Sequence, residues 1–190
     1  MFAKKYLLFC LFPTLIFAQE KILSADFDGD KINDKVYLDS TIGAVVYQLS
    51  SQKFKKVASD NFKDSGEIFF DKTKGGFKVN LNQMRASYSY QFRYEKESGK
   101  MRLIGMERDE FGPANNDGSG ESSVNLLTNN YIGEWNYFDV SKNKLIKMPT
   151  IKKKMVFPKT YFDTLMNEFS TYMDKDVAYY SAEKKRLYKD

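Results

Sequence analysis

The chain has 190 residues, with 30 Lys or Arg against 25 Asp or Glu and no histidine, and its formal net charge at pH 7 is +5. Beyond Cys10 there is no further cysteine, which excludes an internal disulfide, a thiol nucleophile, a Cys/His zinc site and a histidine-based triad from the rest of the chain. The positive charge is too mild to indicate a nucleic-acid partner.

The N-terminal segment 1–18 has the pattern of a secretory signal peptide. Lys4 and Lys5 precede the apolar run 6–17, and Ala18 is a small residue at its exit. This run is too short to span a membrane, which takes about 20 apolar residues, and no later stretch reaches that length. We therefore expect cleavage near Ala18, no transmembrane segment, and an exported protein that is either periplasmic or extracellular.

Next comes a loop, 26–34, with aspartates at its first, third, fifth and ninth positions. They are Asp26, Asp28, Asp30 and Asp34. Carboxylates at this spacing curl around one hard cation, and without a cation they would repel one another. Helical calcium loops draw oxygen ligands from these positions and from the backbone carbonyl at position 7. The loop therefore predicts a Ca²⁺ site made by the four side chains and the Ile32 carbonyl, with a metal-free acidic turn as the alternative.

The flanks of this loop are strand-like, with Ile22 and Leu23 before it and the apolar segment 36–38 after it. In this context the loop resembles the integrin-type FG-GAP (VCBS-like) calcium loop rather than a helix–loop–helix EF-hand. The matching residues are Asp26, Asp28, Gly29, Asp30 and Asp34. Two features depart from the pattern: Lys31 stands at the sixth position, where glycine is usual, and no bidentate glutamate follows at the twelfth. A non-glycine residue at that turn costs on the order of 1 kcal/mol.

The layout as a whole resembles small secreted bacterial proteins that carry a single such loop. It is also distantly similar to calcium-containing periplasmic lysozyme inhibitors of β architecture, which block their target by inserting a loop into its cleft. That similarity rests on layout, because their inhibitory motif has no residue-by-residue counterpart in this chain.

The middle of the chain alternates between apolar and polar residues. In 88–94 every second residue is aromatic, which is typical of a half-buried strand, and 77–81 repeats the period. Shorter strand candidates are 35–38, 44–47, 67–70, 101–104, 123–127, 133–138 and 144–147. Glycine-containing turns separate many of these runs, and short connections require antiparallel pairing. We expect a mainly β fold: an antiparallel sheet or sandwich of about 8–10 strands in a single domain, 19–176.

One amphipathic helix is predicted near the C-terminus, at about 160–174. Thr160 is the candidate N-cap, and the apolar stripe should pack on the sheet. The stripe consists of Phe162, Leu165, Met166, Phe169 and Met173. The polar basic tail 177–190 is expected to be frayed or weakly helical.

Three further features have more than one interpretation. The stretch 111–122 is either a flexible connection, a binding loop or a second metal site formed by its polar side chains. The aromatic residues Tyr131, Trp135 and Tyr137 either fill the core or form an exposed cluster for a sugar or a protein. A carboxylate pair could hydrolyse glycosides if two acids converge. The candidate acids are Glu107, Asp109, Glu110, Glu121 and Glu134.

Taken together, these features favour an exported, calcium-stabilised, non-enzymatic binding module whose partner is a protein or glycan outside the cytoplasm. Its sharpest form is an inhibitor or immunity-type protein that acts on an envelope or wall-directed enzyme. One alternative is a carboxylate-dependent carbohydrate or ester hydrolase. Another is a structural envelope component that lies on an anionic polymer, because 141–190 holds 12 Lys or Arg against 6 Asp or Glu.

Overall fold

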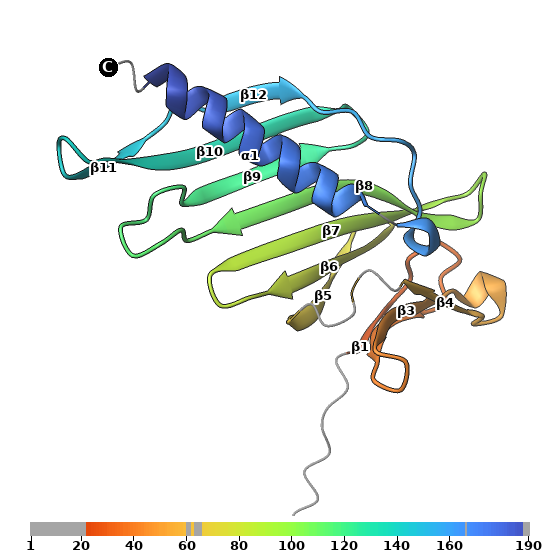
Figure 1. Cartoon of the computed structure of the whole chain (residues 1–190). Coiled ribbons are helices and arrows are strands. Elements are labelled where there is room, and N and C mark those ends of the chain that lie inside the picture. The colour runs from red at the N-terminus through yellow and green to blue at the C-terminus, as the bar shows by residue number, and fades with distance from the viewer. Residues whose placement is uncertain (1–21, 60–61, 63–65, 166, 188–190) are drawn as a thin grey trace, which may run out of the picture.

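The computed structural model describes residues 22–59, 62, 66–165 and 167–187. The predicted signal peptide, 1–18, lies outside these residues. The described part of the chain contains twelve strands in two antiparallel sheets, followed by one C-terminal α-helix (Figure 1). The predicted mainly β fold is confirmed, with more strands than the 8–10 expected, because several strands are only four residues long.

The small sheet has four strands in sequence order. Its strands are β1 (Ile22–Ala25), β2 (Asp34–Asp39), β3 (Ala44–Gln48) and β4 (Lys56–Ser59). The aspartate loop 26–34 connects β1 to β2, and a short 3₁₀ turn, η1 (Ser50–Gln52), lies between β3 and β4. The sheet is therefore a meander of hairpins, as the short connections predicted.

The large sheet has eight strands and follows the same meander. Its strands are β5 (Glu67–Thr73), β6 (Gly76–Asn82), β7 (Ala86–Glu95), β8 (Lys100–Glu110), β9 (Gly120–Asn125), β10 (Asn130–Asp139), β11 (Lys144–Lys147) and β12 (Ile151–Lys154). The outer side of β10 is shared by two short strands. Residues 130–133 pair with β12, and residues 136–139 pair with β11.

Strand β7 shows why one face of the large sheet is covered. Its residues Tyr88, Tyr90 and Phe92 alternate with polar ones and are all buried. Side chains two apart in a strand share a face, so these three rings lie on one side of the sheet. The Phe169 ring of the C-terminal helix lies 4.8 Å from that of Tyr88. The helix and the small sheet therefore cover the same face, and the other face stays open (Figure 1).

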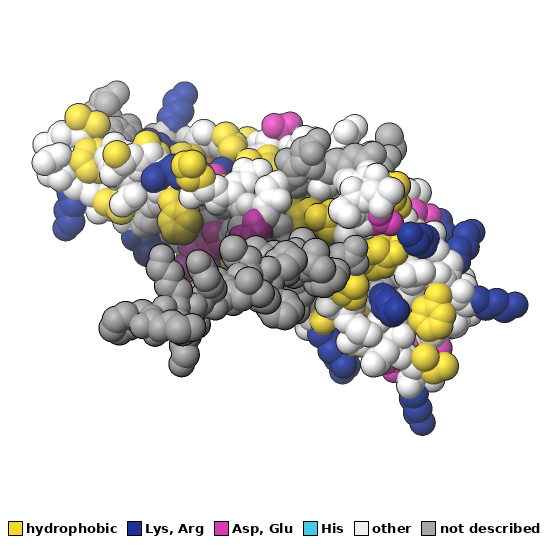
Figure 2. Space-filling view, turned by 90° about the horizontal axis from the view of Figure 1, so that it is seen from below, with side chains coloured by type: hydrophobic (Ala, Val, Ile, Leu, Met, Phe, Trp, Pro, Cys, Tyr) yellow, Lys and Arg dark blue, Asp and Glu magenta, His cyan; other side chains and the backbone are white. Residues whose placement is uncertain are grey.

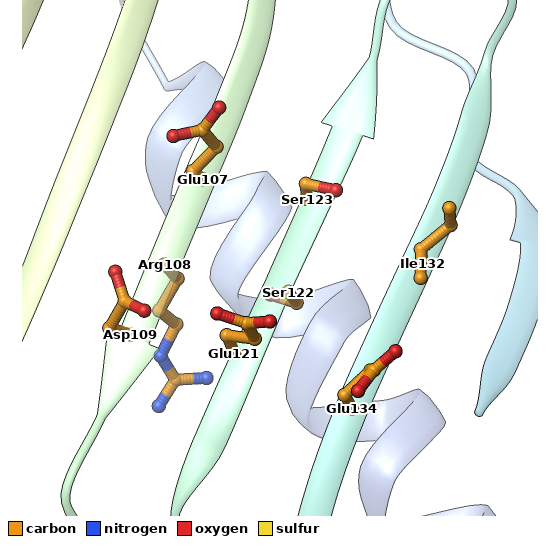
Figure 3. A pocket seen from close by; sticks show the side chains of 8 residues that line it. All are labelled: Glu107, Arg108, Asp109, Glu121, Ser122, Ser123, Ile132 and Glu134. Carbon is orange, nitrogen blue, oxygen red and sulfur yellow. The ribbon is translucent and has the colours of Figure 1, made fainter. Parts of the chain in front are cut away.

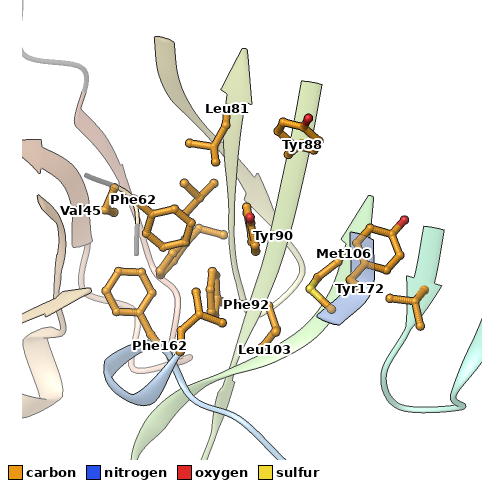
Figure 4. Close-up of a cluster of buried hydrophobic side chains, with 14 of the residues drawn as sticks. Val45, Phe62, Leu81, Tyr88, Tyr90, Phe92, Leu103, Met106, Phe162 and Tyr172 are labelled. Atoms are coloured by element: carbon orange, nitrogen blue, oxygen red, sulfur yellow. The ribbon is translucent and has the colours of Figure 1, made fainter. Parts of the chain in front are cut away.

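The core between the two sheets is aromatic. The ring of Phe92 lies 5.5 Å from that of Phe77 and 5.1 Å from that of Phe162, and the ring of Phe162 lies 5.1 Å from that of Tyr47 on β3. Phe62 packs on the same group (Figure 4). Each fully buried side chain of this size contributes about 1.5–3 kcal/mol relative to an exposed one, so this cluster fixes the small sheet on the large one.

The C-terminal helix differs from its predicted position. Helix α1 spans Glu168–Leu187 rather than about 160–174, so the tail 177–190, expected to be frayed or weakly helical, is part of this helix as far as Leu187. Phe162 lies in a separate 3₁₀ turn, η3 (Phe162–Thr164), and points into the inter-sheet core. Phe162 has the apolar spacing that predicted an earlier helix start, but it belongs to the turn η3 and inserts its ring into the core.

Helix α1 is joined to the sheet by a buried polar network centred on Asp176, which is fully buried. Arg108 donates to its carboxylate at 2.8 Å, Ser122 donates at 3.1 Å, and the Tyr131 hydroxyl donates to the other oxygen. Tyr172 bonds Ser122 at 2.6 Å. A buried charge is tolerated only when it is paired and hydrogen-bonded, and Asp176 meets both conditions.

Asp176→Ala should therefore lower the free energy of unfolding by about 3–5 kcal/mol, because it removes the buried carboxylate to which Arg108, Ser122 and Tyr131 all donate. Asp174→Ala, at an exposed position of the same helix, should change it by less than about 0.5 kcal/mol. Urea denaturation followed by circular dichroism measures both. Equal effects of the two substitutions would contradict the structural role of the network.

Candidate metal centre

The aspartate loop turns sharply at two residues with positive φ. Gly29 has φ +89° and Lys31, at the sixth position, has φ +72°. The left-handed conformation that calcium loops need at this position is therefore present, although the residue is not glycine. Phe27 is fully buried and its ring lies 5.2 Å from that of Phe77, so the loop is anchored to the core of the molecule by its second residue.

Three of the predicted ligands converge. Asp26, Asp28 and Asp34 each offer a carboxylate oxygen, and these oxygens all lie within 4.8 Å of one another. Asp34 is fully buried, whereas Asp26 keeps partial access to solvent. A group of hard, anionic oxygen ligands at this separation can hold a metal ion, and among metals it suits Ca²⁺, Mg²⁺ or Mn²⁺ rather than zinc or copper.

Backbone amides orient these carboxylates. Asp26 accepts hydrogen bonds from Gly29 N at 2.7 Å and from Lys31 N at 3.0 Å. Asp34 accepts one from Phe27 N at 2.7 Å, and Asp28 accepts one from Asp30 N at 3.2 Å. The loop backbone is thus folded around its own side chains, so the three oxygens are held together by local geometry.

Asp30 lies outside the converging group. Its Oδ1 accepts a hydrogen bond from Ile32 N at 2.8 Å, and its Oδ2 accepts one from the Ser50 hydroxyl at 2.7 Å. The side chain of Ile32 is exposed, and the role predicted for its carbonyl remains a prediction. The structure therefore brings together three of the four predicted aspartates and leaves Asp30 outside their group.

Two serines of η1 complete the surroundings of the site and were not found from the sequence. The Ser51 hydroxyl donates to Asp28 Oδ2 at 2.5 Å, and the Ser50 hydroxyl donates to Asp34 Oδ1 at 3.0 Å. Ser50 N also donates to Asp34 Oδ1 at 2.8 Å. Both serines lie more than 15 positions from the aspartates they contact, so no local spacing could have indicated them.

A second group of acids lies on the open face of the large sheet. Asp109, Glu121 and Glu134 are directly opposite one another on β8, β9 and β10. Together with Glu107 they line a pocket of about 250 Å³, and their side chains point away from α1 (Figure 3). Directly opposed like charges destabilise a sheet. These four acids, named here the acidic row, were candidates from the sequence, but only the strand register shows that they converge.

The remaining candidates have structural roles. Tyr131, Trp135 and Tyr137 are buried and belong to the core. In the stretch 111–122, Asp117 accepts a 2.7 Å hydrogen bond from Lys184 and a 2.8 Å bond from Phe138 N. Burial opposes the charged form of Asp117, but these donors hold its pKa below the ordinary value. Asp117 thus fastens the loop to α1, and among the described residues it belongs to no group of converging acids that could hold a metal ion.

Comparisons with family models, with curated proteins and with solved structures found no match for this chain. The resemblance to FG-GAP loops therefore rests on the residues of the loop alone. Within the described residues, no helix combines the length and the apolar character needed to cross a bilayer.

Lys31→Gly should raise the free energy of unfolding by about 1 kcal/mol, because glycine adopts a positive φ without the steric cost of a Cβ. Lys31→Ala keeps the Cβ and should give no such gain. Urea denaturation of both variants measures the difference. A gain of the same size in the alanine variant would show that the lysine side chain, rather than the backbone conformation, is the source of the cost.

Proposed function

We propose that this chain is an exported, non-enzymatic binding module, stabilised by Ca²⁺, whose partner is a protein or glycan outside the cytoplasm. The observation that supports it most is the difference between the two faces of the large sheet. One face of the large sheet is buried under α1 and the small sheet, whereas the other presents charged and polar side chains to solvent. A rigid sheet that leaves one face open is a suitable platform for recognition.

The convergence of Asp26, Asp28 and Asp34 supports the calcium part of this proposal. Their ligand atoms are all carboxylate oxygens, which suit Ca²⁺. A cation there would neutralise the charges that gather where the 26–34 loop meets η1. It would hold the 26–34 loop together in a chain that offers no disulfide beyond Cys10.

The acidic row supports the binding part. Lys78 pairs with Glu107 and Lys147 with Glu134, but Asp109 and Glu121 form no ion pair within the described residues. Their negative charges favour a positively charged partner and accelerate its association. We assign this face to an inhibitor or immunity-type interaction with an envelope or wall-directed enzyme. In this assignment the acids contact the partner rather than catalyse a reaction. Asp109 and Glu121 are exposed, whereas a carboxyl group that acts as a general acid at neutral pH is usually buried in an apolar pocket.

A structural role on an anionic polymer has weaker support. Figure 2, which views the molecule from below relative to Figure 1, shows Lys and Arg side chains projecting at separate places around the rim and not gathered in one patch on the side in view. Several of the cations in 141–190 are also engaged in ion pairs. Lys147 pairs with Glu134, Lys159 with Glu95 and Lys184 with Asp117.

Calcium binding is tested by thermal unfolding of the protein in EDTA and in millimolar Ca²⁺. At a hundredfold excess over Kd, binding to the folded state adds about 2.7 kcal/mol, which should raise Tm by roughly 5–10 °C for a domain of this size. Asp28→Ala should abolish the rise, because it removes one of the three converging carboxylates. Asp30→Ala should keep most of it. Equal Tm shifts in wild type and the Asp28 variant would reject this site.

Partner binding is tested by capture from an envelope extract on immobilised protein. Glu121→Lys reverses the central charge of the acidic row while relieving its repulsion, so the variant should fold and retain a captured partner about tenfold less well. Asp174→Lys makes the same charge change on α1 and should capture as wild type does. Turnover of an envelope glycan by the wild type, abolished in Glu121→Gln, would instead establish the hydrolase alternative.

A further inference from the structure

A second pocket, of about 300 Å³, lies at the end of the open face where β7 turns into β8. Its walls include Arg93, Arg102, Ile104 and Leu127. Arg93 and Arg102 are directly opposite one another on the two strands, one position beyond the buried pair of Phe92 with Leu103. Their side chains therefore lie on the open face, at the other end of β8 from Asp109. We call this feature the arginine pocket.

The two guanidinium groups of the arginine pocket are incompletely paired. Among the described residues, none forms a hydrogen bond or ion pair with the Arg93 side chain, and none bonds the buried Nε of Arg102. Arg102 reaches one carboxylate oxygen, of Glu95, at 3.4 Å. Two cations directly opposite on neighbouring strands destabilise a sheet unless an anion lies between them or beside them.

Glu95 is not a sufficient counter-ion for this pair, because other donors already use its oxygens. Lys159 contacts Oε1 at 2.7 Å, while the Tyr161 hydroxyl and the Ser98 hydroxyl donate to Oε2 at 2.6 and 2.9 Å. The bonds from Lys159 and Tyr161 lower the pKa of Glu95 to about 2, so its charge is committed to them. Lys96 and Glu97 also line the pocket, which therefore holds three cations against two carboxylates, one of which is the Glu95 that Lys159 already pairs with.

One wall of the pocket is apolar. Strand β8 has one extra residue opposite the step between Gln91 and Phe92, and the residue left unpaired by this bulge is Ile104. Ile104 is only 6% exposed, yet it does not belong to the main core. Bulges often re-aim a side chain beside a binding site. The bulge places Ile104 near Leu127, which is 46% exposed, so the arginines have a hydrophobic neighbour.

We propose that the arginine pocket binds an oxyanion, a carboxylate or a phosphate, carried on a ligand with a small apolar group. Two guanidinium groups with free N–H donors match the paired oxygens of such anions. The apolar group would lie on Ile104 and Leu127. The arginine pocket contains no residue of the aspartate loop or of the acidic row. A negative result here would therefore leave the proposed function unchanged, and the reverse also holds.

The test is a titration of ¹⁵N-labelled protein followed by NMR of the arginine Nε–Hε groups and the Ile and Leu methyl groups. The probes are inorganic phosphate, N-acetyl-leucine and the uncharged N-acetyl-leucine amide, at constant ionic strength. Both anions should shift the Arg93 and Arg102 signals, N-acetyl-leucine should also shift the methyl signals of Ile104 and Leu127, and the amide should shift neither set. Shifts by phosphate without any by N-acetyl-leucine would overturn the apolar part of the proposal.

Arg93→Gln removes one exposed guanidinium that no described residue pairs with, so the variant should fold. Its affinity for both anions should be at least about tenfold weaker, the loss expected for one charge-assisted hydrogen bond. Arg186→Gln changes an arginine of α1 that pairs with Glu183 and should bind as wild type does. No shift of the two arginine signals up to tens of millimolar probe, or equal affinity in wild type and Arg93→Gln, would overturn the proposal.

Discussion

The fold depends on covering one face of a long, curved sheet with two unlike elements. No single element spans that face: the small sheet covers the side nearer β5–β7, and α1 covers the side nearer β8–β10. Phe162 lies where the two covers meet, and its ring contacts Tyr47 of the small sheet as well as Phe77 and Phe92 of the large one. The position of the small sheet, and with it the aspartate loop, follows from this packing.

The strand pattern could be predicted because it is local. Aromatic rings at every second position identify β7 without any tertiary information. The helix could not be placed correctly for two reasons that are not local. Phe162 and Leu165 have helical spacing but serve the core from a turn and the segment after it. The true stripe of α1 contains Asp176, whose burial depends on Arg108 and Tyr131, far away in the chain. Strands β4 and β12 are short and lysine-containing, and their pattern was too weak to indicate them.

The candidate sites also depend partly on local sequence, which could be predicted, and partly on contacts between distant residues, which could not. Spacing within nine residues predicted that all four aspartates converge. Asp26, Asp28 and Asp34 do so, whereas Asp30 lies outside their group and bonds Ser50, 20 positions later. On the open face the alternation showed which residues are polar. Which of them meet depends on strand register, and the bulge at Ile104 changes that register midway along β8. The sequence therefore shows which side chains lie on the open face, but not which of them are adjacent across neighbouring strands.

The pairing of two short strands along the outer side of β10 affects whether another molecule can add a strand to the sheet. A long unpaired strand would offer its N–H and C=O groups to another chain, and sheets with such edges aggregate. Here that side is occupied by two strands of four residues each, β11 and β12, and Lys152, Lys153 and Lys154 occupy three of the four positions of β12. Short length and repelling charge make this border of the sheet a poor template for another chain.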